Sequence, residues 1–295
     1  MSESPPTERV ISILEFLAAD DDPLNSAQIA DGLALSRSTA GAILSSLESR
    51  GWVRRLPDLT YQLGPAALAM AEKARSSVPV PDERTIAEIE SLAARVGCGA
   101  ALSLISATQM TFVGVTTGRG LVPAGITVGT RMALRAPAGA SAIAFASPPV
   151  QQTWLRAASR QDRVPAFADV LGLIRDRGVA VWGIDTGDIA SLDVLAEVVT
   201  HLDDRPASES LRERVLLMLN DISGHPYQAE ELDSEVHLPV SYISAPVFGR
   251  NGQPVWELQI GPLRSAVSRD EREHYCEQIK ISAERLGDRE ALDVS

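Results

Sequence analysis

The sequence has few cysteines, no clustered metal ligands and no long apolar run, and each absence narrows the possibilities. Cys98 and Cys276 are the only cysteines in 295 residues, without metal-type spacing, which suits a reducing cytoplasm. The four histidines are scattered, so we expect no metal. No run of about 18 apolar residues is present, so the sequence predicts no membrane span. The polar first residues do not resemble a signal peptide, and we expect a cytoplasmic protein.

Motifs that mark common enzymes are also missing. The sequence contains no Gly-x-Ser-x-Gly, no Gly-x-Gly-x-x-Gly after a strand and no Gly-Lys-Ser/Thr. We therefore predict no catalytic residue and no cofactor, and an enzyme is the less favoured hypothesis. Hydrophobic residues make up 45% of the chain, as in globular proteins with substantial cores. The length favours two domains, at about 150 residues each.

Lysine is nearly absent, and the charged residues are unevenly distributed. The net charge is −12, but Thr186–Leu238 alone carries twelve acidic and three basic residues. Gly32–Leu63, by contrast, carries four arginines against two acids, a net charge of +2. That segment is compatible with DNA but supplies little non-specific attraction. We therefore expect weak non-specific binding and a need for two copies acting together.

The segment from Ser26 to Leu63 has the spacing of a DNA-reading domain. We expect one short helix capped by Ser26 and a second helix that runs from its cap Ser36 to Arg50. Two short strands around a turn follow. An upstream helix can cover both, because its apolar residues fall on one face: Val10, Ile13, Leu14 and Leu17. The order predicts an all-α winged helix-turn-helix domain, whose second helix enters the major groove. A three-helix bundle without a nucleic-acid role is the alternative.

The exposed start of the second helix is unusual for a plain bundle. Small hydroxyls there can meet phosphates or base edges, and Gly41 lets the helix approach DNA closely. Arg54 and Arg55 stand where a wing would meet the DNA backbone. The predicted DNA-binding residues are Ser26, Gln28, Ser36, Arg37, Ser38, Thr39, Gly41, Arg54, Arg55 and Tyr61.

A linker separates this domain from the rest of the chain. Residues 65–75 favour a helix that begins with proline, and the prolines of residues 76–81 indicate an extended hinge. We therefore expect a DNA-binding domain at 1–64, a linker helix and hinge at 65–81, and a second domain at 82–295.

In the second domain, apolar runs alternate with helical patterns. Strands are expected at 100–105, 110–115, 125–128, 179–183, 241–248 and 254–260. The last two form the clearest hairpin, because Asn251-Gly252 favours a tight turn. Helices are expected at 83–96, 137–146, 151–158, 164–177 and 269–286. The pattern predicts an α+β domain with a mostly antiparallel sheet, a common way to hold a small ligand.

Several segments, taken in order, resemble the IclR-type bacterial transcriptional regulators. The resemblance lies in Ile11–Leu17, Leu24–Ala30, Leu35–Ala40, Leu47–Val53, Tyr61–Pro65, Val128–Gly139, Ser244–Val255 and Gly261–Pro262. It implies a GAF-like effector-binding domain behind the winged helix. It also implies a double-stranded DNA operator whose occupancy a small-molecule effector controls, such as an organic acid or an aromatic metabolite. Members of the family form homodimers, which can pair into tetramers.

Three departures from the family pattern bear on function. Gly41-Ala42 stands where the family has a polar, often basic pair, so base reading would depend on the rest of that helix, the wing and DNA shape. Arg135-Ala136-Pro137 replaces a histidine followed by hydroxyl residues. An acidic insert at 186–238, with helical patterns of its own, replaces a short connection. A degenerate member that senses a ligand or binds a protein, without sequence-specific DNA binding, is therefore the alternative function.

For the effector, the segment around Pro137 is the strongest candidate. If Pro137 opens a helix, the free N–H groups there favour an anion, and Arg131 and Arg135 are placed to clamp a carboxylate. The alternative is that both arginines are ordinary surface or dimer-contact residues. The predicted effector-binding residues are Arg131, Met132, Arg135, Ala136, Pro137, Ala138, Gly139, Ser241, Ser244, Trp256 and Leu258.

The strand at 256–260 leaves the charge of the effector open. Its alternation gives one apolar face and one face that carries Glu257 and Gln259. The sequence does not show which face meets the cavity. An acidic face would discourage a carboxylate and favour a neutral or cationic ligand.

Overall fold

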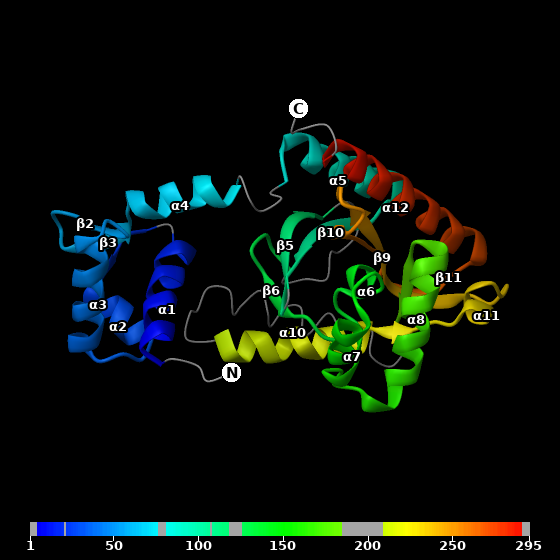
Figure 1. Cartoon of the computed structure of the whole chain (residues 1–295), viewed down its shortest axis with the longest axis horizontal. Helices are drawn as coiled ribbons and strands as arrows, with labels where there is room; N and C mark the ends of the chain where they lie inside the picture. The colour runs from blue at the N-terminus through cyan, green and yellow to red at the C-terminus, as the bar shows by residue number, and fades with distance from the viewer. Residues whose placement is uncertain are drawn as a thin grey trace. The chain divides into compact units, whose positions relative to one another are not determined.

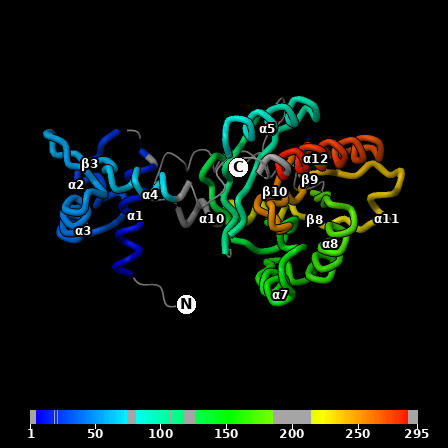
Figure 2. The backbone as a smooth tube through the Cα atoms, turned by 45° about the horizontal axis from the view of Figure 1, so that its top comes forward, coloured from blue at the N-terminus to red at the C-terminus, as the bar shows by residue number. Residues whose placement is uncertain are grey.

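The computed structural model describes residues 5–20, 22–75, 81–106, 108–117, 126–184 and 209–290. They form two compact units, one within residues 1–79 and one within residues 80–201 and 210–295, each with its own hydrophobic core (Figures 1 and 2). None of the described helices is long and apolar enough to cross a membrane.

The first unit is a helical bundle with a small antiparallel wing. It contains α1 (Pro5–Ala19), β1 (Leu24–Asn25), α2 (Ser26–Gly32), α3 (Arg37–Ser49), β2 (Val53–Arg55), β3 (Thr60–Leu63) and α4 (Pro65–Arg75). Its three strands follow the order β1-β3-β2. Ile13 and Leu17 of α1 pack against Ile29 of α2 and Leu44 of α3. The arrangement confirms the predicted winged helix-turn-helix.

The cap of α2 differs from the prediction by one residue. Asn25, and not Ser26, caps the helix, because its Oδ1 accepts the N–H groups of Ala27 and Gln28, both at 3.0 Å. Gln28 Oε1 in turn accepts the N–H of Asn25 at 2.8 Å, which completes a capping box. Ser26 is therefore the first helical residue. The side chains of Ser26 and Gln28 are exposed.

The second unit is built on an eight-stranded sheet. Its strands are β4 (Gly99–Ile105), β5 (Gln109–Thr116), β6 (Arg131–Ala133), β7 (Ala180–Gly183), β8 (His225–Pro226), β9 (Leu238–Phe248), β10 (Pro254–Gly261) and β11 (Arg264–Val267). They follow the order β6-β5-β4-β10-β9-β7-β8, with β11 paired to β9. Every pairing between these described strands is antiparallel, which confirms the predicted α+β domain.

Helices lie on both sides of this sheet. They are α5 (Glu83–Val96), α6 (Ala140–Ile143), α7 (Pro148–Arg156), η1 (Gln161–Arg163), α8 (Val164–Arg177), α10 (Glu209–Ser223), α11 (Ala229–Leu232) and α12 (Arg269–Glu290). α5 and α12 cover one face, where Ile89 and Ile279 pack with Leu258 (Figure 1). α6, α7 and α8 lie on the other side, around Phe167 and Trp182.

Residues 126–128 do not form the predicted strand, and β6 is the edge strand instead. The backbone turns at residues 127–130, where the N–H of Thr130 donates to the carbonyl of Thr127 at 3.0 Å. The side chain of Thr130 accepts the N–H of Thr127 at 3.0 Å. Gly129 has a φ of +92° there, a backbone conformation that ends an extended run.

The helix predicted at 137–146 is shorter than expected. It spans only Ala140–Ile143, because Gly139 precedes it as the N-cap with a φ of +75°. A Cβ at Gly139 would also approach Leu134 Cδ1 to 2.3 Å, so the position requires glycine. The predicted hinge at 76–80 and the first part of the insert, 186–208, lie outside the described residues.

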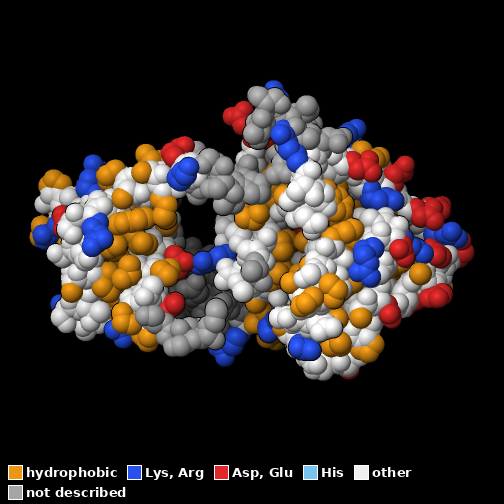
Figure 3. All heavy atoms as spheres, viewed as in Figure 1, with side chains coloured by type: hydrophobic (Ala, Val, Ile, Leu, Met, Phe, Trp, Pro, Cys, Tyr) orange, Lys and Arg blue, Asp and Glu red, His pale blue; other side chains and the backbone are white. Residues whose placement is uncertain are grey.

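Exposed ion pairs gather where α11 meets the start of α12. Arg269 bonds Glu235 at 2.8 Å and Glu273 at 2.9 Å, and Arg177 holds Asp233 with both of its Nη atoms at 2.8 Å. Figure 3 shows acidic and basic side chains interspersed at this end of the second unit. Such pairs contribute little to stability when solvent screens them.

Candidate functional site

The start of α3 forms an exposed polar tip. Ser36 caps the helix as predicted, since its Oγ accepts the N–H of Thr39 at 3.1 Å. The same Oγ lies 3.0 Å from Ser38 Oγ and 2.8 Å from Thr39 Oγ1. Arg37 is exposed, and no described residue pairs with it in an ion pair. The tip therefore offers hydroxyl groups and one unpaired guanidinium to a partner, and we refer to residues 36–39 as the α3 tip.

The helix behind the tip is held from its opposite face. The buried residues of α3 are Ala40, Leu44 and Leu47. Gly41 and Ala42, which follow Ala40 directly, are on the exposed face. A Cβ added at Gly41 would meet nothing within 4 Å. Glycine is therefore not required by the packing of this unit, although it weakens the helix.

The wing carries the other exposed arginines. Arg54 and Arg55 lie on β2 and are exposed, and Arg54 forms no ion pair with a described residue. The guanidinium of Arg55 lies 5.8 Å from the centre of the Tyr61 ring. Tyr61 itself is 8% exposed and belongs to the hydrophobic core of the first unit, so little of its side chain is available for the predicted contact with DNA. Its ring supports the wing and orients Arg55.

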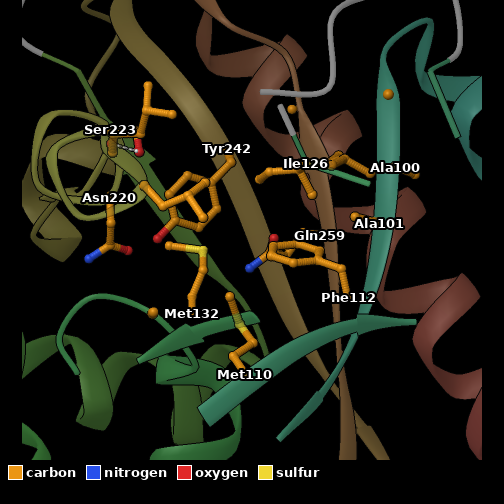
Figure 4. A pocket seen from close by; sticks show the side chains of 16 residues that line it. Ala100, Ala101, Met110, Phe112, Ile126, Met132, Asn220, Ser223, Tyr242 and Gln259 are labelled. Atoms are coloured by element: carbon orange, nitrogen blue, oxygen red, sulfur yellow. Dashed lines mark hydrogen bonds between the residues drawn. The ribbon is translucent and has the colours of Figure 1, made fainter. Parts of the chain in front are cut away.

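The second unit contains a cavity between the sheet and α10. Its space is about 640 Å³, including the part open to solvent. Figure 4 shows most of its wall, which consists of Gly99, Ala100, Ala101, Met110, Phe112, Ile126, Met132, Ala138, Leu216, Leu219, Asn220, Ser223, Tyr242, Gln259, Ile260 and Gly261. Four of these side chains are polar and most of the others are apolar. The mainly apolar lining with a few polar groups suits a small molecule.

One wall of the cavity comes from the acidic insert. Four residues of α10 face the cavity: Leu216, Leu219, Asn220 and Ser223. Their spacing is i, i+3, i+4 and i+7, so they share one helical face. These residues were not predicted to bind an effector, although their spacing was a usable signal.

The polar side chains of the cavity differ in how they are bonded. Ser223 Oγ donates to the carbonyl of Leu219 at 2.6 Å, and Gln259 Nε2 donates to Glu257 Oε1 at 2.7 Å. The Tyr242 ring stacks on Trp182, with centroids 5.7 Å apart. Burial, together with the charge of Glu257, raises the pKa of the Tyr242 hydroxyl well above its usual value of 10. That hydroxyl is therefore a neutral group at physiological pH.

Glu257 lies behind the cavity and is 1% exposed. Its Oε2 accepts the N–H of Ser141, in the first turn of α6, at 2.9 Å. Burial raises the pKa of this carboxyl to about 7, although the bonds from Gln259 and Ser141 act against the shift. The prediction that free N–H groups at Pro137–Gly139 bind an effector anion was wrong, because α6 starts at Ala140 and its N-terminus already holds the Glu257 carboxyl.

The predicted effector residues separate into two groups. Met132 and Ala138 line the cavity. Arg131 is exposed on the edge strand β6, and Arg135 lies near Asp221 of α10, where its charge opposes the rise in the pKa of Asp221 caused by burial. Neither arginine is part of the cavity wall, so a carboxylate clamp formed by them would lie outside this cavity. The remaining members of that segment, Ala136, Pro137 and Gly139, are buried outside the wall.

The effector-binding residues predicted on β9 and β10 are buried in the interior of the second unit. Trp256 and Leu258 are 4% and 0% exposed and pack in the core beneath α5 and α12, on the face opposite Glu257, so their assignment to the cavity was wrong. Ser241 Oγ donates to the carbonyl of Trp182 at 2.9 Å. Ser244 Oγ accepts the Nε1–H of that same tryptophan at 3.2 Å. Both serines are fully engaged inside the protein and are not part of the wall.

Glu257→Gln is expected to change how stability depends on pH. The pKa of Glu257 rises from 4.5 to about 7 on folding. The contribution of this carboxyl to the free energy of unfolding is therefore fully present below pH 4.5 and is lost as the pH rises through 7. Each tenfold change in proton affinity is worth about 1.4 kcal/mol, so the loss approaches about 3 kcal/mol. Urea unfolding of both proteins from pH 4.5 to 8 should show the wild type losing stability relative to the variant. A constant difference across that range would contradict the assignment.

The first unit is a winged helix-turn-helix, and the second is an α+β unit that contains a cavity. Residues 6–57 match the sequence profile of the IclR helix-turn-helix domain. No match was found among curated proteins. The chain thus carries an IclR helix-turn-helix domain, as the resemblance in the sequence implied.

Solved structures extend the match to the whole chain. An IclR transcriptional regulator from Alicyclobacillus acidocaldarius has a TM-score of 0.59 and 17% identity, and covers 98% of this chain and 100% of its own. The Thermotoga maritima IclR has a TM-score of 0.56 and 18% identity, over 96% and 98%. An IclR homologue from Microbacterium hydrocarbonoxydans, solved with 4-hydroxybenzoate, has a TM-score of 0.59 and 17% identity, over 97% and 99%. The chain therefore has the fold of IclR regulators along its length.

Proposed function

We propose that the chain is a transcriptional regulator that binds a DNA operator with the α3 tip and the β2 wing. The observation that carries this proposal is the pair of exposed arginines, Arg37 and Arg54, free of ion pairs with described residues on an IclR helix-turn-helix domain. Helices of this kind read bases with their first turn, while the flanking wing contacts phosphates.

Fluorescence anisotropy with DNA taken from upstream of the chain's own gene tests this proposal. Because the domain carries little positive charge, we expect tight binding to one fragment and much weaker binding to scrambled DNA of the same length. Affinity should fall as salt is raised, in proportion to the number of phosphates contacted. Failure to bind the fragment even at low salt would support the degenerate alternative, in which the first unit serves a protein contact.

Gly41→Ala separates the stability of the unit from its contact with DNA. Alanine is expected to raise the free energy of unfolding by about 0.5–1 kcal/mol, because it is the better helix former and its Cβ meets nothing. If α3 lies against DNA, the same methyl group should weaken operator binding severalfold. Thermal melting and anisotropy on one preparation measure both effects. Higher stability with unchanged affinity would place this face of α3 away from DNA.

We further propose that a small molecule in the cavity controls operator occupancy. The cavity has the mainly apolar lining, with a few polar groups, that is typical of a ligand site, and a structurally similar IclR homologue was solved with 4-hydroxybenzoate. On this proposal residues 1–64 bind DNA, residues 65–81 link the two parts, and residues 82–295 form the effector domain, which contains the acidic insert at 186–238.

A homodimer in the cytoplasm completes the proposal. Leu68 and Met70 of α4 are 64% and 58% exposed, and a second copy of the chain would cover such apolar side chains. Pairing two first units would also supply the second DNA contact that the low positive charge requires. Sedimentation velocity should show a dimer or a tetramer at micromolar concentration, and a monomer would contradict the assembly.

A further inference from the structure

The polar part of the cavity is made of uncharged side chains. Among the described residues of its wall, none is Lys, Arg, His, Asp or Glu. Asn220 and Ser223 come from α10, and Tyr242 and Gln259 come from the sheet (Figure 4). A carboxylate in this wall would lose its hydration without meeting a cation, and an ammonium group would lose its hydration without meeting a carboxylate.

Asn220 is the polar residue of the cavity wall whose side chain has a buried donor without a partner among the described residues. The residue is 7% exposed, its Nδ2 is fully buried, and its amide forms no hydrogen bond with any described residue. A buried amide without a partner destabilises the folded state. On the same face of α10, Leu216 and Leu219 are apolar, and the Ser223 hydroxyl donates to the carbonyl of Leu219 instead of bonding Asn220. The amide can donate to or accept from a ligand that enters the cavity.

Gln259 separates the cavity from the buried acid behind it. Its Nε2 is held by Glu257 Oε1 at 2.7 Å, and Glu257 Oε2 is held by the N–H of Ser141 at 2.9 Å. Both carboxyl oxygens therefore have partners inside the protein. Any negative charge on Glu257 lies directly behind the Gln259 amide and repels an anion in the cavity.

The apolar part of the wall favours a flat or ring-shaped body. Met110, Phe112 and Met132 come from two neighbouring strands, and Figure 4 shows both methionines extending toward the space beside Asn220. Thioether side chains are adaptable and make favourable contacts with aromatic rings.

We propose that the cavity binds an uncharged, mainly apolar molecule, such as an aromatic amide, ester or alcohol, whose polar group pairs with the Asn220 amide, and that it discriminates against the corresponding carboxylate. The inference rests on the proposed function in taking this cavity as the effector site. Binding is measured without DNA, so a failure of the charge preference and a failure of DNA control can be told apart.

Thermal melting and calorimetry on the full chain test the preference with matched pairs at pH 7. The pairs are benzamide with benzoate, methyl 4-hydroxybenzoate with 4-hydroxybenzoate, and phenylacetamide with phenylacetate. The neutral member of each pair should raise the melting temperature and bind at least about tenfold more tightly than its acid, because only the acid must be desolvated as an ion. Equal or tighter binding of the acids would overturn the proposal, and so would the absence of a shift with every compound.

Asn220→Leu tests the proposed partner at nearly constant volume. Affinity for the bound amide should fall about tenfold, since one hydrogen bond is removed. The free variant should melt at the same or a higher temperature, because Asn220 bonds to no described residue. A lower melting temperature with unchanged affinity would mean a structural role and would overturn the assignment. Asn251→Leu, in the exposed turn between β9 and β10, is the matched control and should leave the affinity unchanged.

Discussion

Replacing Arg272 with methionine is expected to lower the free energy of unfolding of the second unit by about 3 kcal/mol. Arg272 is 2% exposed on α12 and forms no ion pair with a described residue. Its Nη1 donates to the carbonyls of Val236 and Val267 at 2.9 and 2.8 Å. Its Nη2 donates to those of Leu232 and Ser234 at 3.0 and 2.7 Å. Methionine fills the space but leaves four carbonyl groups without this donor.

The measurement is urea unfolding followed by tryptophan fluorescence. Three of the four tryptophans, Trp154, Trp182 and Trp256, lie in the second unit and report mainly on it. A loss of this size corresponds to a fall in melting temperature of roughly 6–12 °C for a unit of 150–250 residues.

Arg269→Met, three residues earlier on the same helix, is the matched control for Arg272→Met. Arg269 is 38% exposed, and its partners Glu235 and Glu273 are more exposed still. Its removal should lower the free energy of unfolding far less than the removal of Arg272, because solvent screens such pairs. Arg272→Lys should fall between the two, since an ammonium group has three donors and lacks the planar fork. Equal effects of the two methionine variants would mean that the four carbonyl bonds do not hold this region together.

Helix ends were predictable where a side-chain cap or a glycine stop marks the end of the apolar repeat. α5 has Asp82 as its cap, whose carboxylate accepts the Thr85 N–H at 2.7 Å, and ends at Gly97 with a φ of +68°. α8 spans Val164–Arg177 as expected, because Gly178 adopts a φ of +72°. These signals are local and need no knowledge of the fold.

The orientation of β10 could not be predicted, because both of its faces are buried. Leu258 is 0% exposed beneath α5 and α12, and Glu257 is 1% exposed on the other face. A polar residue in an alternating strand usually marks the solvent side, and here it marks a second interior instead. Glu257 is buried because the N-terminus of α6, a distant segment, supplies the N–H of Ser141.

The cavity was harder to predict than the recognition helix for a related reason. The α3 tip is a contiguous segment, so Ser36, Arg37 and Thr39 could be named from spacing alone. The cavity draws Asn220 from an insert and Gln259 from a strand far along the chain. Their approach depends on pairings across the whole sheet, which periodicity does not specify.

Removing both Arg37 and Arg54 is expected to reduce operator affinity by a factor of at least about 100. Each side chain is exposed and has no ion-pair partner among the described residues, so neither substitution should disturb the first unit. A bond from arginine to a base or phosphate is worth about 1–3 kcal/mol. A dimer of the variant lacks four such bonds, two in each protomer. The slope of log affinity against log salt should also become shallower by about 0.9 for each phosphate that the variant no longer neutralises.

Arg9→Ala with Arg50→Ala removes the same charge from the first unit and is the control for this variant. Arg9 is exposed on α1, and Arg50 is exposed at the carboxyl end of α3, the end away from its tip. If the tip and wing hold the DNA, this control should stay within about threefold of wild type, because only general attraction is reduced. Equal reductions in both variants would indicate non-specific attraction only. Wild-type affinity in the Arg37 and Arg54 variant would place the DNA elsewhere on the protein.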